Sequence, residues 1–558
     1  MGFIVRLFIF LFITPLLGVD GLDKKADLSS QATLSTPSME YNPHLKKQIQ
    51  FLASRGRIVH AIELYKEIKQ KTNKHHTELL RELSFGILES GRGSRDPETL
   101  LMTLLGAGIS LDESTDHILA EAIESDIPEL NLIALNFISS FSNDNAEMLL
   151  LKALRSNYLP IRLEALHRLS AVRHPFALVQ AEALFHKLEG DILGIFPDFF
   201  LMMDDPKANR IIKKMLMHKK SEVRIPTILS IIKYHRDDFL PMITGQAEQL
   251  DIAQAEACAC AFGVFKESTS IKKLEQMARS SSCNVKLSAL RALTMFGDEL
   301  AKTEIMQMAR NHNLFAITLL GDIPGAEDCL AVLTQDKDPC IRFNAAMALL
   351  ELHDPRAVKG ISEILIKDLR DIAITKQMSI GKTLFYYKLI PSAQQNSNAD
   401  PLLYELSLKI KESILEKAAL FKEKEFLQLA QTILDMRQDD LVPSLVNLLE
   451  TLETEGAIKL LCTYAETPGA PLIRSFANLS LYRLGVEGPY FENLKNWIQN
   501  QKTVPLIRLR PVVPINMRSD KTSFELTPEE LSRILVESFE SFVKTQDERG
   551  LDILIEMI

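Results

Sequence analysis

The stretch Ser379-Ile-Gly381-Lys382-Thr383 ends in the Gly-Lys-Thr triplet of a phosphate-binding loop. In such a loop the lysine and the backbone amides surround a nucleotide phosphate, and an earlier glycine begins the cradle. Lys376 occupies the position of that glycine, so the cradle is incomplete. We therefore expect no phosphate site here and place the triplet on a helix surface.

Histidine, cysteine and serine do not form a catalytic or metal-binding pattern. His75 and His76 are adjacent in a polar stretch, and no Cys/His group has the spacing of a zinc site. The patterns Gly-x-Ser-x-Gly and His-Glu-x-x-His do not occur. The sequence thus predicts a protein that is not an enzyme and has no catalytic, cofactor-binding or metal-binding residues. We expect His75 and His76 to be solvated.

The cysteines lie within or beside apolar helical stretches. Cys258 and Cys260 are two residues apart, which separates them by about 200° around a helix, so they cannot form a disulfide with each other. We favour buried free thiols over disulfides. The six cysteines are Cys258, Cys260, Cys283, Cys329, Cys340 and Cys462.

The first 21 residues have the pattern of a secretory signal peptide. Arg6 precedes an apolar run of 11 residues, Leu7 to Leu17, which is too short to span a membrane. Cleavage is expected after Gly21 or Gly18, and residues 22–44 form a polar linker. We expect an exported protein, periplasmic or secreted, with no stable membrane span after cleavage. An uncleaved anchor is the alternative.

Composition favours a globular helical protein without affinity for nucleic acid. The chain has 558 residues, 46% of them hydrophobic, and only 23 are Gly, so tight β-turns are few. Its 64 basic and 73 acidic residues give a net charge of −9, which provides no general basic field.

Most of the chain is apolar at helical spacing, and one block recurs about every 30 residues. The block is a polar turn, an apolar residue, a basic or polar residue and a helix of small residues. A single helix pair cannot bury its apolar face, whereas stacked pairs form a continuous core. The basic or polar position of the block is Asn131, Arg162, Arg224, Gln254, Lys286, Arg342 and, in a late copy, Arg474.

Residues 338–357 and 285–298 resemble HEAT-like repeats, of the short kind also found in phycobilisome lyases. The resemblance implies an all-α superhelix of stacked helix pairs. Together with the expected signal peptide, it suggests an exported bacterial protein of this repeat class. In such repeats the basic residue of the block pairs with an acidic residue of the adjoining turn or repeat. It therefore implies a structural role for Arg162, Arg224, Lys286, Arg342 and Arg474.

Outside these repeats, Leu52 to Tyr65 is similar to a tetratricopeptide helix pair, and the Pro-bearing stretch from Val504 to Ile515 is expected to be extended. The expected order is a signal peptide (1–21), a linker (22–44), an N-terminal helical region (45–120), a HEAT-like solenoid (121–390), a second repeat segment (402–500), an extended strap (501–526) and C-terminal helices (527–558).

Two basic groups are candidate partner-binding residues: Lys213, Lys214, Lys219 and Lys220 in the repeats, and Arg508 and Arg510 in the strap. The alternatives are a solvated helix face and a strap that ties down the last helices. The aromatic run from Phe196 to Phe200 is expected in the core. We therefore expect a non-catalytic scaffold that binds a protein partner on its concave face, without nucleic acid, metal or cofactor. The alternatives are a tetrapyrrole lyase or chaperone-like factor, and a secreted effector.

Overall fold

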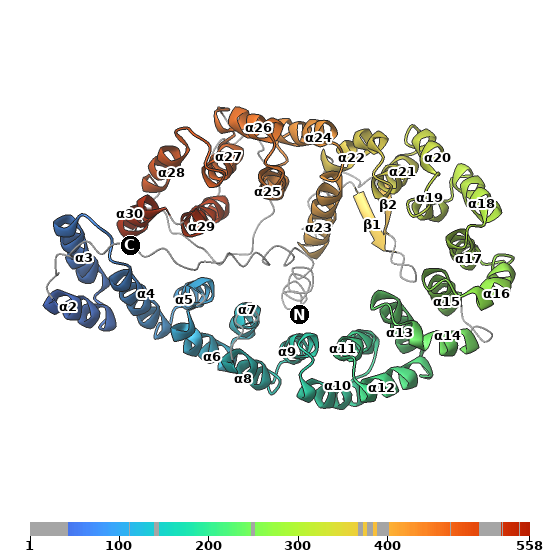
Figure 1. Ribbon diagram of the computed structural model, residues 1–558, viewed down its shortest axis with the longest axis horizontal. Helices are drawn as coiled ribbons and strands as arrows, with labels where there is room; N and C mark the ends of the chain where they lie inside the picture. Colours follow the sequence, from blue (N-terminus) through green and yellow to red (C-terminus); the bar gives the residue numbers. More distant parts are fainter. Residues whose placement is uncertain are drawn as a thin grey trace, which may run out of the picture. The chain divides into compact units, whose positions relative to one another are not determined.

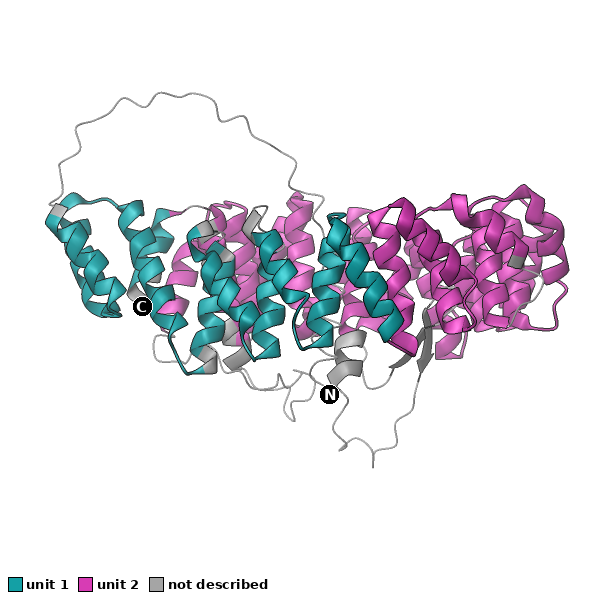
Figure 2. Cartoon of the chain, turned by 90° about the horizontal axis from the view of Figure 1, so that it is seen from below, with its two compact units in different colours: residues 1–187, 548–558 teal, residues 188–547 magenta. Residues whose placement is uncertain are grey.

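A computed structural model describes residues 43–557 apart from 111, 139–143, 247–251, 367–371, 377–382, 388–400, 469, 501–525, 527 and 546. The expected signal peptide, almost all of the linker and the strap with Arg508 and Arg510 lie outside the described residues. The chain divides into two compact units, residues 1–187 with 548–558 and residues 188–547 (Figure 2).

Unit 1 is built from pairs of antiparallel helices in two layers (Figure 1). Helices α5, α7 and α9 pack along one layer, and α2 with α4 and α6 with α8 pack along the other. Its elements are α2 (Pro43–Ser54), α3 (Ile58–Thr72), α4 (Thr77–Arg92), α5 (Pro97–Ser110), η2 (Glu113–Thr115), α6 (Asp116–Glu124), α7 (Pro128–Ile138), α8 (Asp144–Ala153), α9 (Leu159–Ala171), α10 (Pro175–Lys187) and α30 (Glu548–Met557).

Unit 2 continues the same pairing (Figure 1). Its elements are η3 (Asp191–Ile195), α11 (Phe196–Met203), α12 (Pro206–Leu216), α13 (Ser221–Lys233), η4 (Asp237–Phe239), α14 (Leu240–Gln246), α15 (Ile252–Val264), η5 (Ser268–Ser270), α16 (Ile271–Met277), α17 (Cys283–Met295), α18 (Glu299–Arg310), α19 (Leu314–Leu320), α20 (Glu327–Leu333), α21 (Pro339–Glu351), η6 (Pro355–Ala357), α22 (Val358–Ile366), β1 (Ile372–Lys376), β2 (Thr383–Tyr387), α23 (Pro401–Ala418), α24 (Glu423–Asp435), η9 (Asp439–Leu441), α25 (Val442–Leu452), α26 (Glu455–Ala465), α27 (Pro471–Arg483), α28 (Tyr490–Gln499) and α29 (Pro528–Thr545).

The predicted all-α fold class is confirmed, with one added element. Strands β1 and β2 form an antiparallel hairpin in which Ile374 pairs with Phe385, and β2 contacts α19 and α21. Thr383, the last residue of the Gly-Lys-Thr triplet, begins β2. The expectation that the triplet lies on a helix is therefore wrong for Thr383. The residues of β1 and β2 are mostly β-branched or aromatic, and such residues favour strands even where the flanking chain is helical.

Small residues allow the helices of neighbouring repeats to approach closely. A Cβ added to Gly263 on α15 would lie 2.9 Å from the Cα of Ala292 on α17. A Cβ on Gly321, at the end of α19, would lie 3.0 Å from the Cα of Ala348 on α21. The aromatic run is in the core as expected, with Phe196, Phe199 and Phe200 at most 1% exposed.

The turns that end the repeat helices share one backbone geometry. Arg173, His235 and His353 have φ values of 57°, 51° and 55°, the left-handed region that ends many helices. In each turn the next residue's amide donates to the carbonyl five residues earlier; the Arg236 amide, for example, donates to the Ile231 carbonyl at 3.0 Å. These three helices therefore end in the same way before the next helix of the repeat begins.

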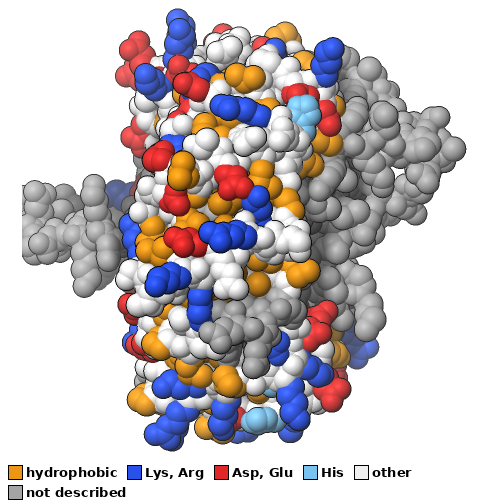
Figure 3. Space-filling view, turned by 90° about the vertical axis from the view of Figure 1, so that its right-hand side faces the viewer, with side chains coloured by type: hydrophobic (Ala, Val, Ile, Leu, Met, Phe, Trp, Pro, Cys, Tyr) orange, Lys and Arg blue, Asp and Glu red, His pale blue; other side chains and the backbone are white. Residues whose placement is uncertain are grey.

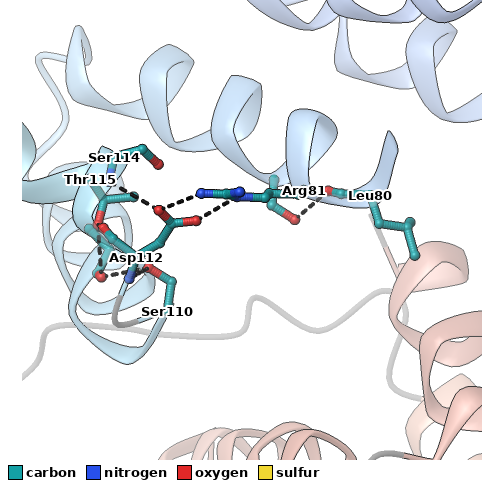
Figure 4. Close-up of polar contacts among 8 residues, drawn as sticks. Leu80, Arg81, Ser110, Asp112, Ser114 and Thr115 are labelled. Carbon is teal, nitrogen blue, oxygen red and sulfur yellow. Dashed lines mark hydrogen bonds and ion pairs between the residues drawn. The ribbon is translucent and has the colours of Figure 1, made fainter. Parts of the chain in front are cut away.

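Polar contacts between neighbouring repeats join residues about 30 positions apart. Arg81 on α4 donates to both carboxylate oxygens of Asp112, at 2.7 and 2.9 Å, 31 residues further along the chain (Figure 4). These bonds, with a further one from the Ser114 amide, lower the pKa of Asp112 to about 2. Arg291–Asp322 and Arg236–Asp204 are further pairs of this kind, with separations of 31 and 32 residues.

Candidate protein-binding surface

Helix α12 separates an apolar face from a basic one. Asp205 caps its first turn by accepting a hydrogen bond from the Lys207 amide at 2.7 Å, and Pro206 is the first helical residue. One side is buried in the core and consists of Ala208, Ile211, Ile212, Met215 and Leu216.

The opposite side of α12 carries four exposed cations, and two more lie in the turn that follows. At about 100° per residue, the four helical positions fall within an arc of about 120°. No acidic residue occurs between Pro206 and Ser221. We call this group the basic face; its members are Lys207, Arg210, Lys213, Lys214, Lys219 and Lys220.

Arg224 fixes the turn that presents Lys219 and Lys220. Its guanidinium donates to the carbonyl oxygens of His218 and Lys219, at 2.7 and 2.8 Å. Its Nε donates to Oε1 of Gln254 in the next repeat, at 2.9 Å. The turn is thus held by both its own helix and the neighbouring repeat, which orders the backbone under the two lysines.

Arg342 repeats this arrangement, donating to the carbonyls of Asp336 and Lys337 and to Glu363 at 2.9 Å. Lys286 lies 2.6 Å from Glu304 on α18. The other two repeat positions differ: Nε of Arg162 is buried without a hydrogen-bond partner among the described residues, and Arg474 is exposed on α27. The acidic pairing implied by the resemblance is therefore seen at Arg342 and Lys286.

In the described part of the chain, the basic face gathers six exposed cations without ion-pair partners on one helix and the turn that follows it. None of its six side chains forms an ion pair with any residue that the structure describes, whereas Lys233, Arg291 and Arg356 all do. Figure 3 shows basic and acidic side chains interspersed over most of one face, with Lys and Arg gathered at its lower end. Of the acidic residues that flank the basic face in the sequence, Asp205 caps α12 and Asp204 pairs with Arg236 at 3.0 Å, whereas Glu222, in the first turn of α13, is exposed.

A second surface feature is a groove of about 590 Å³ in unit 1, between α2, α4 and α6. Glu89 and His117 pair with each other across it, and Arg92 lies 3.1 Å from Glu89. The groove therefore offers less uncompensated charge than the basic face. It is lined by Gln50, Phe51, Ala53, Ser54, Glu82, Phe85, Gly86, Glu89 and His117.

The expectation that His75 is solvated is wrong, because its side chain is only 7% exposed. Its Nδ1 shares a 2.9 Å hydrogen bond with the Tyr65 hydroxyl, and its Nε2 lies 3.3 Å from Asp552 on α30. Burial, with the charge of Lys69, lowers the pKa of His75 below its ordinary value. The cover comes from the far end of the chain, which no local pattern around His75 could indicate.

Within the described part of the chain, no group of three or more His, Cys, Asp and Glu side chains is arranged to hold a metal ion. Among the same residues, no helix combines the length and apolar character needed to cross a membrane.

The cysteines are all free thiols, but not all are buried as expected. Cys258 and Cys329 are buried, while Cys283 is exposed at the first turn of α17 and accepts a hydrogen bond from the Asn313 amide group at 3.2 Å. Cys283 is the first residue of α17 and lies next to the turn that precedes the helix. Its thiol is therefore exposed to solvent, although the helix residues that follow it are largely apolar.

We expect Cys283 to be the first thiol modified by an alkylating reagent in the native protein. Cys258, at 0% exposure, should react only after denaturation, because reagent and solvent cannot reach its sulfur. Peptide mapping by mass spectrometry gives the rate for each site, and Cys283→Ser should remove the fast phase alone. Equal rates at all six thiols would contradict the packing of α15 and α17.

No protein-family model matches the chain, and no curated protein is detectably similar to it. Its fold is similar to solved helical-repeat structures. The chain is an α-solenoid. The similar structures include the CpcE–CpcF complex of phycocyanin lyase from Nostoc, with 17% identity and a TM-score of 0.28 over 38% of this chain and 92% of that chain.

Kap95p in a complex with RanGDP is 10% identical, with a TM-score of 0.32 over 90% of this chain and 85% of that chain. UNC-45 from Drosophila melanogaster is 13% identical, with a TM-score of 0.31 over 92% of this chain and 79% of that chain. These likenesses concern the fold of HEAT and armadillo-like proteins and carry no information about activity.

Four of the six members of the basic face were predicted from the sequence as partner-binding residues, whereas Lys207 and Arg210 were not. Their helical spacing to Lys214 was the signal that could have added them. The groove in unit 1 was not predicted, since Phe51, Glu82 and His117 come from three helices with no shared motif.

Proposed function

We propose that this chain is a non-catalytic scaffold that binds a protein partner through its helical repeats. The observation that carries the proposal is the basic face of α12, whose six exposed cations have no carboxylate partner among the described residues. Elsewhere in the repeats, exposed cations are often satisfied by a neighbouring repeat. A surface left uncompensated in this way is available to a second molecule.

We further propose that the protein is exported and acts outside the cytoplasm, as a periplasmic or secreted protein. The support is the pattern of Arg6 followed by the apolar run Leu7 to Leu17, which lies outside the described residues. Mass spectrometry of the N-terminus of protein from its native source tests this proposal. A mature chain beginning at residue 19 or 22 supports export, and an intact Met1 in all recovered protein overturns it.

The binding proposal is tested with the full chain immobilised and exposed to native extract, followed by identification of retained proteins. A retained candidate is then purified and its binding to the free full chain measured by calorimetry. We expect a complex of defined stoichiometry that forms without any chemical change in either protein. Failure of every purified candidate to bind, or turnover of a retained molecule, would overturn the scaffold proposal.

A further inference from the structure

We propose that the basic face binds an acidic protein segment, a short stretch of Asp and Glu side chains presented by the partner. This inference rests on the proposed protein-binding function and adds the chemistry of the partner to it.

The cations are mostly lysines, which bind anions without a fixed geometry. Five of the six are Lys and only Arg210 carries a guanidinium. An ammonium group is a point charge with rotatable donors, whereas a guanidinium makes paired, directional bonds to a carboxylate or a phosphate group. The basic face therefore attracts negative charge without fixing its orientation, as an acidic peptide segment requires.

The spacing of the cations matches carboxylates on a short segment. Lys207, Arg210 and Lys214 follow one another at three and four residues on α12, which places their Cβ atoms about 5–6 Å apart. From Lys207 to Lys214 the helix rises about 10 Å. Lys219 and Lys220 extend the charge beyond the helix end on a turn fixed by Arg224. Two turns of an acidic helix, or a few extended residues, would cover this surface.

The described neighbouring elements neutralise the basic face only in part: Glu222, exposed in the first turn of α13, lies two residues after Lys220. Helix α14, which packs beside α12, carries no charged residue. Asp204 and Asp205 are already engaged with Arg236 and with the Lys207 amide. The charge of the basic face is thus directed to solvent, so a partner's carboxylates would gain attraction without displacing an existing ion pair.

Two other polyanions fit this surface less well. A single-stranded nucleic acid uses aromatic side chains for base stacking, and among the residues described on α12 and its following turn Met217 is the only large exposed apolar side chain. A membrane surface is normally bound with several apolar side chains inserted next to the cations, and Met217 alone does not provide them.

The probe for the test is a short Glu/Ala peptide, with a Gln/Ala peptide of the same length as its control, titrated against the full chain. We expect the Glu/Ala peptide to bind and the Gln/Ala peptide not to bind. Because the attraction is between exposed charges, the dissociation constant should rise at least about tenfold between low and physiological salt. Equal binding of the two peptides would overturn the inference.

A charge-reversal variant assigns the binding to this face. In the variant Lys213, Lys214, Lys219 and Lys220 are each changed to Glu, which should weaken peptide binding at least about tenfold. The matched control reverses the exposed lysines Lys337, Lys359, Lys424 and Lys459, which changes the net charge by the same amount. The control should keep the wild-type affinity within about twofold, because these lysines lie on other helices and turns.

All eight lysines are exposed and without ion pairs among the described residues, so both variants should keep the wild-type melting temperature. Equal weakening by both variants would show that only net charge matters and would overturn the assignment to α12. If an oligonucleotide or anionic lipid vesicles bind more tightly than the peptide, the partner is of another class and the acidic-segment inference is overturned.

The outcomes also separate this inference from the proposed function. If a purified protein partner binds the charge-reversed variant as well as the wild type, the scaffold proposal stands and the acidic-segment inference fails. If no purified protein binds the wild-type chain while the Glu/Ala peptide still does, the scaffold proposal fails.

Discussion

Replacement of Arg483 by Met is expected to lower the free energy of unfolding of the C-terminal helices by about 3 kcal/mol. Arg483 donates three hydrogen bonds of 2.6 to 3.0 Å to the carboxylate of Glu450 on α25, and one of 3.0 Å to Ser541 on α29. Its side chain is 13% exposed and that of Glu450 is 20% exposed. Removal of the cation leaves a largely buried carboxylate without its partner.

The protein contains a single tryptophan, Trp497 on α28, next to α27. Urea unfolding followed by its fluorescence therefore reports on the helices that Arg483 connects. The control is Lys495→Met, whose partner Glu492 is 59% exposed, and its effect should stay below about 0.5 kcal/mol. The double variant Arg483→Met with Glu450→Met should be more stable than Arg483→Met alone, since no carboxylate is then stranded. Equal effects of Arg483→Met and Lys495→Met would refute the role assigned to Arg483.

Substitution of Ala for Gly263 is expected to destabilise the contact between α15 and α17 by about 2 kcal/mol. The added Cβ would lie 2.9 Å from both the Cα and the Cβ of Ala292, and 3.0 Å from the sulfur of Met295. Backbone atoms cannot rotate away as a side chain can, so the helix axes must separate. Hydrogen exchange of the amides in α15 and α17 measures the opening free energy of this pair.

The same substitution at Gly245 on α14 should have the opposite sign. No heavy atom lies within 4 Å of a Cβ built there, and alanine favours a helix over glycine by up to about 1 kcal/mol. Gly245→Ala should thus leave the exchange of α15 and α17 unchanged or slow it slightly. A slower exchange in Gly263→Ala than in the wild type would show that the close approach is not required.

The repeat architecture was predictable because each helix pair carries its own signal. The basic position, the small residues and the turn recur at about 30 residues, and the structure places their interaction partners at the same spacing, as in Arg224 with Gln254. Apolar spacing at Phe196 to Phe200 likewise placed these residues in the core. Such features depend on residues within one repeat or the next, so they can be predicted from a short stretch of sequence.

Other features depend on segments distant in the sequence and were not predictable. The burial of His75 involves α30, and Arg483 contacts Ser541, 58 residues away, in addition to Glu450 at the repeat spacing of 33 residues. The exposed thiol of Cys283 also differs from its apolar context, because helix ends face turns. For the basic face, the run of basic residues in the sequence predicted four of the lysines. That α14 packs beside α12 and carries no carboxylate to pair with them became apparent only from the structure.

The position of α30 in unit 1 has a consequence for the order of folding during synthesis. Asp552 pairs with Lys69, 483 residues earlier in the chain, and Ile555 packs into the cluster that contains Ile49 and Tyr65. At about 5–20 residues per second, a ribosome needs roughly 25–100 s to supply that last helix after the first hairpin has emerged. Domains usually mature from the N-terminus onward, but here the packing of α2 and α3 is completed by α30. The hairpin of α2 and α3 therefore keeps part of its apolar surface uncovered until residues 548–557 have been synthesised.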